Sequence, residues 1–224
     1  MNIDRLAGWY RWFEYAAFGM ALERRRFAFL DRLAGAQAVL VLGEGDGRAL
    51  ARLLSSAPMA RFDVVDASAE MLALARRRTG NSERVRFLCQ DARAFDWPTE
   101  HYDAIVTFFF LDCFGEEDAR RLIQRMEQAL APSGIWLVSE FAIPETGWRR
   151  WHAEIWILIM YRFFRTTTGL DVGALPPINR LLIDSGMHRV GFEHERGGMI
   201  VSEVWMHGKV GFGQEAAKGH KLFR

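Results

Sequence analysis

Short apolar segments alternate with amphipathic segments along most of the chain. The apolar segments are continuous, as in strands of a parallel sheet that is buried on both faces. The amphipathic segments place apolar residues three and four positions apart, which is the spacing of one helix face. The predicted strands cover residues 38–43, 61–66, 84–91, 102–110 and 134–141, and the predicted helices cover residues 9–30, 47–56, 67–78 and 116–134.

The pattern changes after Pro144. A long amphipathic helix is predicted over residues 146–170, and a shorter helix runs from Pro176 to a stop at Gly186. Two final strands are predicted within residues 188–208, joined through Gly197 and Gly198. A connection this short pairs two strands antiparallel, as a hairpin.

These elements predict an α/β fold with a doubly wound, mostly parallel seven-stranded sheet, helices on both faces and an antiparallel last strand. We expect a single domain over residues 1–224. Its expected parts are an N-terminal helical cap (1–35), a ligand-binding core (36–143), an inserted helical lid (144–175), a final helix and strand hairpin (176–209) and a tail (210–224).

Composition narrows the function classes. The 29 lysines and arginines nearly balance the 28 aspartates and glutamates, so the net charge of +1 gives no support for general nucleic-acid binding. Cys89 and Cys113 are too few for a disulfide framework or a zinc ligand set, and no metal site is expected. The N-terminus lacks the apolar core of a signal peptide, and the apolar run 155–161 is far shorter than the roughly 20 residues that span a membrane. We therefore expect a cytoplasmic protein.

The stretch VLVLGEGDGRAL, residues 39–50, joins the first strand to a helix through Gly43, Gly45 and Gly47. Glycines permit a sharp turn and let a ligand approach the backbone closely. The spacing G-x-G-x-G departs from the dinucleotide pattern G-x-G-x-x-G. Glu44 and Asp46 would repel a pyrophosphate but suit an ammonium group. In the alternative interpretation, Asp46 only caps the helix and the glycines only form a tight turn.

Two further carboxylates follow strands. Asp66 ends the second strand about twenty residues after the glycine turn, where a carboxylate can accept from both hydroxyls of a ribose. A helix N-cap is the alternative role, although Ser68 is placed to cap the same helix. Asp91 follows the third strand and can accept from an exocyclic amine such as that of adenine, or be a solvated turn residue.

The fourth strand ends in FFFLDCF, residues 108–114. Phe108 and Phe109 suit the wall of a site for a flat base or a cation, because a ring face attracts positive charge. Their alternative role is ordinary core packing. Asp112 places a charge at the same edge of the sheet, and it is a candidate for the site.

Taken in order, VLVLGEGDG, VDAS, QDA, YDAIVTFFFLDCF and LAPSGIWLVSEF resemble the motifs of the class I S-adenosylmethionine-dependent methyltransferases, in particular the small-molecule type. The resemblance covers residues 38–141 and extends to the final hairpin. It departs at Val41, where the family usually has an acid, and Glu44 is expected to take part of that role.

The resemblance implies S-adenosyl-L-methionine as the cofactor. The glycines would line its methionine part, Asp66 would hold the ribose, and Asp91 with Ala92 the adenine. The cofactor-binding residues that it implies are Gly43, Glu44, Gly45, Asp46, Gly47, Asp66, Ala67, Met71, Asp91, Ala92, Phe108 and Phe109.

Methyl transfer is an in-line displacement, so the protein mainly has to position the acceptor, which can supply roughly 7–11 kcal/mol. A hydroxyl or amine acceptor also benefits from a base. The candidates are Asp112, His152 and Tyr15, and the alternative for His152 is a structural or surface residue.

Aromatic residues crowd the N-terminal helix and the helix after Pro144. They suggest an apolar or aromatic small-molecule acceptor, although packing of both helices onto the sheet explains them equally well. Shallow membrane contact by residues 148–165 is a third possibility. We expect no nucleic-acid partner, and a monomer or homodimer. The rival functions are a non-catalytic nucleotide- or S-adenosylmethionine-binding protein and an NAD(P)-dependent oxidoreductase.

Overall fold

The computed structural model describes residues 20–208, except for 145–146, 149, 152 and 158–173. The N-terminal part of the predicted helix 9–30, the second half of the predicted helix 146–170 and the tail 210–224 therefore lie outside the described residues. The described residues among 148–157 are helical, as the sequence predicts.

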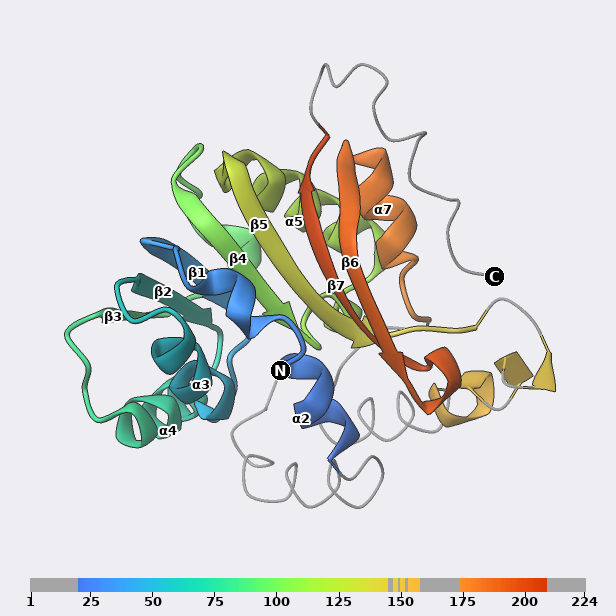
Figure 1. Ribbon diagram of the computed structural model, residues 1–224, viewed down its shortest axis with the longest axis horizontal. Helices are drawn as coiled ribbons and strands as arrows, with labels where there is room; N and C mark the ends of the chain where they lie inside the picture. Colours follow the sequence, from blue (N-terminus) through green and yellow to red (C-terminus); the bar gives the residue numbers. More distant parts are fainter. Residues whose placement is uncertain (1–19, 145–146, 149, 152, 158–173, 209–224) are drawn as a thin grey trace, which may run out of the picture.

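A seven-stranded sheet forms the centre of the fold, in the order β3-β2-β1-β4-β5-β7-β6 (Figure 1). The strands are β1 (Ala38–Leu42), β2 (Arg61–Asp66), β3 (Val85–Cys89), β4 (Tyr102–Phe108), β5 (Leu130–Phe141), β6 (Met187–Glu195) and β7 (Ile200–His207). Strand β7 pairs antiparallel with both β5 and β6, and the other pairs are parallel. The predicted fold class and the reversed last strand are confirmed.

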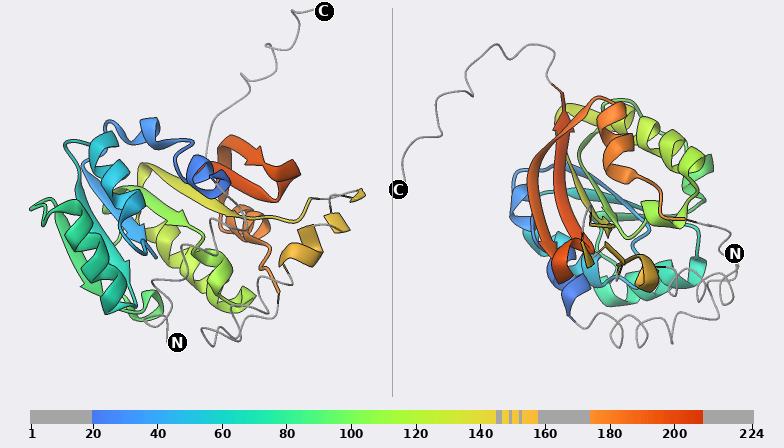
Figure 2. Two further views of the ribbon diagram at one scale, coloured as in Figure 1. Left: turned by 90° about the horizontal axis from the view of Figure 1, so that it is seen from below. Right: turned by 90° about the vertical axis from the view of Figure 1, so that its right-hand side faces the viewer.

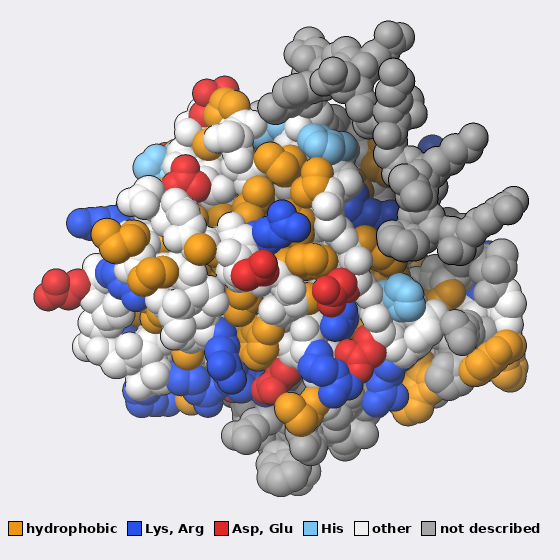
Figure 3. All heavy atoms as spheres, in the orientation of Figure 1, with side chains coloured by type: hydrophobic (Ala, Val, Ile, Leu, Met, Phe, Trp, Pro, Cys, Tyr) orange, Lys and Arg blue, Asp and Glu red, His pale blue; other side chains and the backbone are white. Residues whose placement is uncertain are grey.

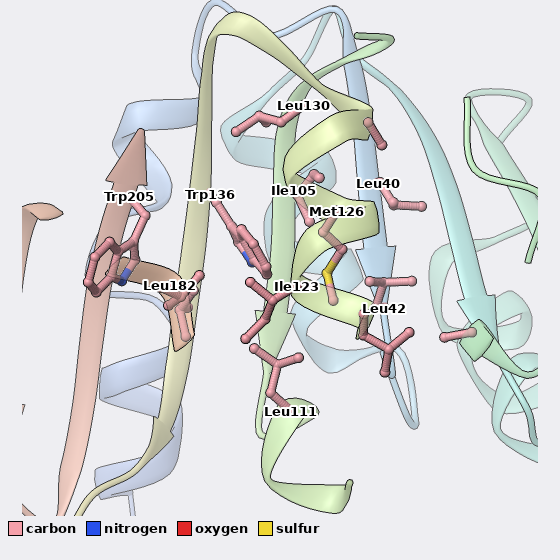
Figure 4. Packing of buried hydrophobic residues seen from close by; sticks show 14 of the residues in the cluster. Leu40, Leu42, Ile105, Leu111, Ile123, Met126, Leu130, Trp136, Leu182 and Trp205 are labelled. Carbon is pink, nitrogen blue, oxygen red and sulfur yellow. The ribbon is translucent and has the colours of Figure 1, made fainter. Parts of the chain in front are cut away.

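Helices cover both faces of the sheet (Figure 2). They are α2 (Ala21–Arg26), α3 (Arg48–Ser56), α4 (Ala69–Thr79), α5 (Glu116–Ala129) and α7 (Ile178–Asp184), with short 3₁₀ turns η2 (Leu30–Leu33), η3 (Ala92–Ala94), η4 (Leu111–Cys113) and η5 (Arg196–Gly198). Successive strand residues face opposite layers. Leu40 and Leu42 pack in one cluster with residues of α5 and α7 (Figure 4). Val39 and Val41 pack on the opposite face with residues of η2 and α3.

Two predicted helices end earlier in the structure. The helix predicted to reach residue 134 ends at Ala129, and β5 already begins at Leu130. Pro132 accounts for this, because a residue that precedes proline is pushed out of the helical region. The helix predicted to reach residue 30 ends at Arg26, since Phe27 and Phe29 leave it to pack against the sheet.

The carboxyl ends of β1 and β4 form the switch point of the sheet. From β1 the chain adds β2 and β3 on one side, and it then returns to add β4 and β5 on the other side. The connections after β1 and β4 therefore leave the sheet in opposite directions, which is where ligands bind in open α/β folds. The glycine turn follows β1, and the Phe109–Asp112 stretch follows β4.

Helix α2 is attached across β5 and β7 at this same end of the sheet. The carbonyl oxygen of Arg25 accepts hydrogen bonds from Ser139 Oγ at 3.2 Å and Ser202 Oγ at 2.6 Å. Arg24 and Arg25 also pair with Glu195 and Glu193 of the β6–β7 hairpin, and Figure 3 shows basic and acidic side chains next to each other there. Exposed ion pairs contribute little stability, so the two serine bonds are the better anchors.

Within the described part of the chain, no helix is long and apolar enough to cross a membrane. The described residues also contain no group of three or more histidine, cysteine or acidic side chains arranged to hold a metal ion.

Candidate functional site

The glycine turn between β1 and α3 has a left-handed backbone at three positions. The φ angles of Gly43, Gly45 and Gly47 are 65°, 70° and 87°. Residues with a side chain rarely adopt these values, so the sequence uses glycine three times. The turn is thereby bent sharply at the carboxyl end of β1.

Each of these glycines has different surroundings. A Cβ on Gly43 would lie 2.5 Å from the Phe110 ring, and a Cβ on Gly47 would lie 2.5 Å from Cα of Ala75 in α4. A Cβ on Gly45 would have no atom of the described residues within 4 Å. Gly43 and Gly47 therefore let the protein pack against itself, whereas the described residues leave the space beside Gly45 open.

Asp66 connects the glycine turn to the end of β2. Its carboxylate accepts from the Gly45 amide at 3.2 Å and from the Ser68 amide at 2.8 Å. Ser68 Oγ caps α4 by accepting from Met71 N at 3.2 Å. The capping role that the sequence left open therefore belongs to Ser68, and Asp66 holds two neighbouring turns together.

The amino end of α3 is occupied by carboxylates of the glycine turn itself. Glu44 Oε1 accepts from Leu50 N at 2.9 Å, and Asp46 Oδ1 accepts from Arg48 N at 3.3 Å. Asp46 also pairs with Arg48 and Arg78, each at 3.0 Å. The bond from the Arg48 amide agrees with the interpretation in which Asp46 caps α3. A bound phosphate would have to compete with both acids for these amides.

Glu44 has an unusual environment. Its second carboxylate oxygen, Oε2, is buried and has no hydrogen-bond partner among the described residues. Burial raises the pKa of Glu44 to about 8. The nearby charges of Asp46 and Asp66 add to the increase, whereas the hydrogen bond from the Leu50 amide and the charge of Arg26 reduce it. A buried acceptor without a donor is unfavourable, so the site suits a ligand that brings a cationic donor.

Arg26 brings a positive charge to this edge from α2. Its guanidinium carbon lies 5.1 Å from the centre of the Phe109 ring, and its charge lowers the pKa of both Glu44 and Asp112. The sequence did not assign it to the site, because nothing local to residues 24–26 indicates where a short helix will dock.

The end of β4 is strained. Phe108 is buried in the core, and Phe109 has a φ of 54°, which is rare for a residue with a bulky side chain. The Phe109 ring packs against the Phe141 ring, with ring centres 5.0 Å apart. Backbone strain of this kind persists where surrounding contacts enforce it, and it is frequent in functional sites.

Asp112 and Glu140 are both buried beside this strained turn. Glu140 Oε1 accepts from the amides of Phe110 at 3.2 Å and Leu111 at 2.9 Å. Burial raises the pKa of Asp112 to about 6, and it raises the pKa of Glu140 well above its ordinary value. Glu140 was missed by the sequence analysis, although an acid within the apolar segment GIWLVSEF already needs a special partner.

The remaining predicted residues are more scattered. Asp91 follows β3, and its exposed carboxylate is held by Arg93, whose side-chain bond lowers the pKa of Asp91. Ala92 and Met71 are buried, and Ala67 is exposed at the end of β2. The proposed bases Tyr15 and His152 lie outside the described residues.

A family profile described as "Methyltransferase domain" matches residues 39–134, which include the glycine turn, Asp66, Asp91 and Asp112. An uncharacterized methyltransferase of Mycobacterium bovis is 32% identical over 132 residues, which is 58% of this chain and 64% of that protein. A demethylmenaquinone methyltransferase of Thermus thermophilus is 33% identical over 133 residues, 58% of this chain and 60% of that one. The matched part therefore spans less than two thirds of each relative.

Solved structures have the same fold. The mitomycin 7-O-methyltransferase MmcR superposes with a TM-score of 0.67 at 17% identity, covering 92% of this chain and 61% of that one. The 1,6-didemethyltoxoflavin-N1-methyltransferase of Burkholderia thailandensis, solved with 1,6-didemethyltoxoflavin and S-adenosylhomocysteine, has a TM-score of 0.63 at 16% identity, covering 90% of this chain and 84% of that one.

The first prediction separates the roles of two glycines. Gly47→Ala should lower the free energy of unfolding by more than about 3 kcal/mol, because left-handed strain of roughly 1–2 kcal/mol adds to overpacking against Ala75. Gly45→Ala, the matched control, should lose only the strain, about 1–2 kcal/mol. Urea unfolding of the three proteins measures this, and equal losses would contradict the close packing of α3 on α4.

The second prediction concerns Glu44. Its pKa in the folded state lies above the ordinary value, so the folded protein binds the proton more tightly, and stability must fall as pH rises towards about 8. Between about pH 6 and 8 the slope should be close to 1.4 kcal/mol per pH unit for this group. Glu44→Gln should remove that slope in urea unfolding, whereas the exposed Glu117→Gln should keep it. A Glu44→Gln profile as steep as the wild type would refute the burial argument.

Proposed function

Because this chain belongs to the class I S-adenosylmethionine-dependent methyltransferases, we propose that it transfers a methyl group from S-adenosyl-L-methionine to a small apolar or aromatic acceptor. The observation that carries the proposal is the buried carboxylate oxygen of Glu44, which has no partner among the described residues and lies beside Gly45, where the same residues leave space. This combination calls for a ligand with a cationic donor.

The residues of the glycine turn fit the proposed cofactor. Its amino-acid end carries an ammonium group, the kind of donor that Glu44 Oε2 lacks within the described residues. Its ribose hydroxyls are donors for Asp66, since a carboxylate can accept more bonds than the two from Gly45 and Ser68. When bound, S-adenosyl-L-methionine supplies a methyl group on a positively charged sulfonium.

The other cofactor contacts are proposed from the strand ends. Asp91 and Ala92 would border the adenine, together with Ala67 and Met71, and Arg93 would keep the Asp91 carboxylate oriented. Phe108 and Phe109 would lie near the sulfonium. Gly43, Asp46 and Gly47 would contribute by shaping the turn, through the contacts with Phe110, Arg78 and Ala75.

An apolar acceptor is favoured by the aromatic residues around this edge. Phe109 packs on Phe141, and Phe110 packs on Phe114 with ring centres 5.0 Å apart. In the segment proposed as a lid, Ala153 and Ile157 pack with α2, and Trp148 and Trp151 are exposed. The printed names of two similar proteins, acting on demethylmenaquinone and on 1,6-didemethyltoxoflavin, support a small-molecule acceptor.

The two rival functions are weaker. An NAD(P)-dependent oxidoreductase needs amides at the amino end of α3 for the pyrophosphate, and those of Arg48 and Leu50 already bond to Asp46 and Glu44. A non-catalytic binding protein would have the same cofactor contacts but no turnover. Asp112 is the base that we propose among the described residues, and its raised pKa suits proton transfer near neutral pH.

Cofactor binding tests the Glu44 assignment. S-adenosylhomocysteine should bind with release of a proton at about pH 7, because an ammonium partner lowers the pKa of Glu44 from about 8. Calorimetry in buffers of different ionisation enthalpy measures the proton, and NADH should not bind. Glu44→Gln should weaken binding roughly 10- to 100-fold.

Glu203→Gln is the control, since Glu203 is a buried glutamate on β7 that pairs with Arg189 at 2.6 Å. It should bind like the wild type. The ammonium contact would be overturned if Glu44→Gln bound S-adenosylhomocysteine as tightly as the wild type and the wild type released no proton on binding. Absence of any binding would overturn the proposed function.

Turnover tests the acceptor class. Formation of S-adenosylhomocysteine should depend on adding phenols, quinols or other apolar aromatic acceptors. Asp112→Asn should lower kcat by about 10²–10⁴-fold, whereas its affinity for S-adenosylhomocysteine near pH 7 should equal that of the wild type. Methylation only of peptides, tRNA or charged metabolites would refute the acceptor class. Cofactor binding without any turnover in a cell extract would favour the non-catalytic alternative.

A further inference from the structure

The buried pair Asp112–Glu140 connects the turn after β4 to the end of β5. Asp112 is 6% exposed and Glu140 is 2% exposed. Glu140 bonds to the Phe110 and Leu111 amides, and the Asp112 side chain is hydrogen-bonded to Glu140. An ionised carboxylate can only accept, so a hydrogen bond between two carboxyl groups requires a proton on one of them. The pair therefore holds a shared proton.

The pair carries one negative charge in that state. Burial raises the pKa of Asp112 to about 6 and that of Glu140 well above its usual range, so the pair is neutral below about pH 6 and singly charged above it. The titratable groups that face the pair are Arg26 of α2 and the Cys113 thiol, which follows Asp112 in η4. Burial raises the pKa of Cys113, and the charges of Asp112, Glu140 and Asp66 add to the increase, so the thiol stays protonated.

A second observation concerns Glu140 Oε2. It is buried, and among the described residues no donor group outside the pair bonds to it. Phe110, whose amide bonds to Glu140, lies with its ring against Gly43 of the glycine turn. Arg26 influences both Asp112 and Glu44. The pair and the glycine turn thus border the same part of the carboxyl edge.

We propose that the Asp112–Glu140 pair, sharing one proton, is a charge-selective subsite that distinguishes the sulfonium of S-adenosylmethionine from the neutral thioether of S-adenosylhomocysteine. The inference rests on the proposed function. A sulfonium has no hydrogen on sulfur to donate, so it is recognised through its positive charge. A carboxylate pair with one negative charge attracts it, whereas the neutral thioether feels no such attraction. The spent cofactor then loses this attraction and leaves more readily.

The experiment compares the two cofactors across pH. The ratio of the Kd of S-adenosylhomocysteine to that of S-adenosylmethionine should rise about 10- to 100-fold between about pH 5 and pH 7.5, and then level off. The titration of Glu44 cancels in this ratio, because both compounds carry the same ammonium group. Sinefungin, which has an amine cation in place of the sulfonium, should follow S-adenosylmethionine.

Variants test the pair directly. Asp112→Asn combined with Glu140→Gln should make the ratio low and independent of pH. Glu140→Gln alone should keep the rise near its wild-type pH, because Asp112 still ionises and the glutamine amide can still donate to it. Asp103→Asn is the control, since that carboxylate accepts from the Gln37 and Ala38 amides at the opposite end of the sheet. It should keep the wild-type profile.

The outcomes separate the two levels of inference. A wild-type ratio that stays flat with pH, while both cofactors bind, would overturn the subsite and leave the proposed function intact. Failure of both cofactors to bind would overturn both. Because the wild-type comparison needs no substitution, the test stands even where a double variant does not fold.

Discussion

Apolar side chains cover both faces of the central strands, so the acids of the candidate site lie at the strand ends. Layers formed by α3 and η2 on one face and by α5 and α7 on the other enclose β1 and the middle of β4 and of β5. The carboxyl ends of four neighbouring strands therefore collect Glu44, Asp66, Asp112 and Glu140 within one edge. Every functional argument made for this protein depends on that concentration of acids.

Such a concentration is unfavourable for stability. Three of these acids have a pKa that burial raises, so the folded state has to hold protons or accept poorly solvated charge near neutral pH. Arg26 offsets part of this, and it is delivered by α2 through the serine bonds to the Arg25 carbonyl. Sites that destabilise the empty protein and are completed by a ligand are a common compromise between stability and function.

The glycine turn uses three alternating positions in three different ways. Gly47 lets α3 approach α4, Gly43 accommodates the Phe110 ring, and the Gly45 amide donates to Asp66. The same backbone bend thus fixes the position of the aromatic turn after β4 relative to β1. A motif that appears uniform in the sequence has a separate physical reason at each glycine.

The sequence by itself determined the strands, the parallel direction of the core strands, the reversed last strand and three of the acids at the strand ends, namely Glu44, Asp66 and Asp112. Continuous apolar segments and glycine turns are local signals. It left open whether Asp46 capped α3 and whether Ser68 or Asp66 capped α4, since such choices depend on which donors come within reach. Only the tertiary structure decided that Arg26 docks beside Glu44, that Glu140 meets Asp112, and that Phe27 and Phe29 leave the first helix. These contacts join residues far apart in the chain, and their free energy depends on burial and distance, which no local pattern encodes.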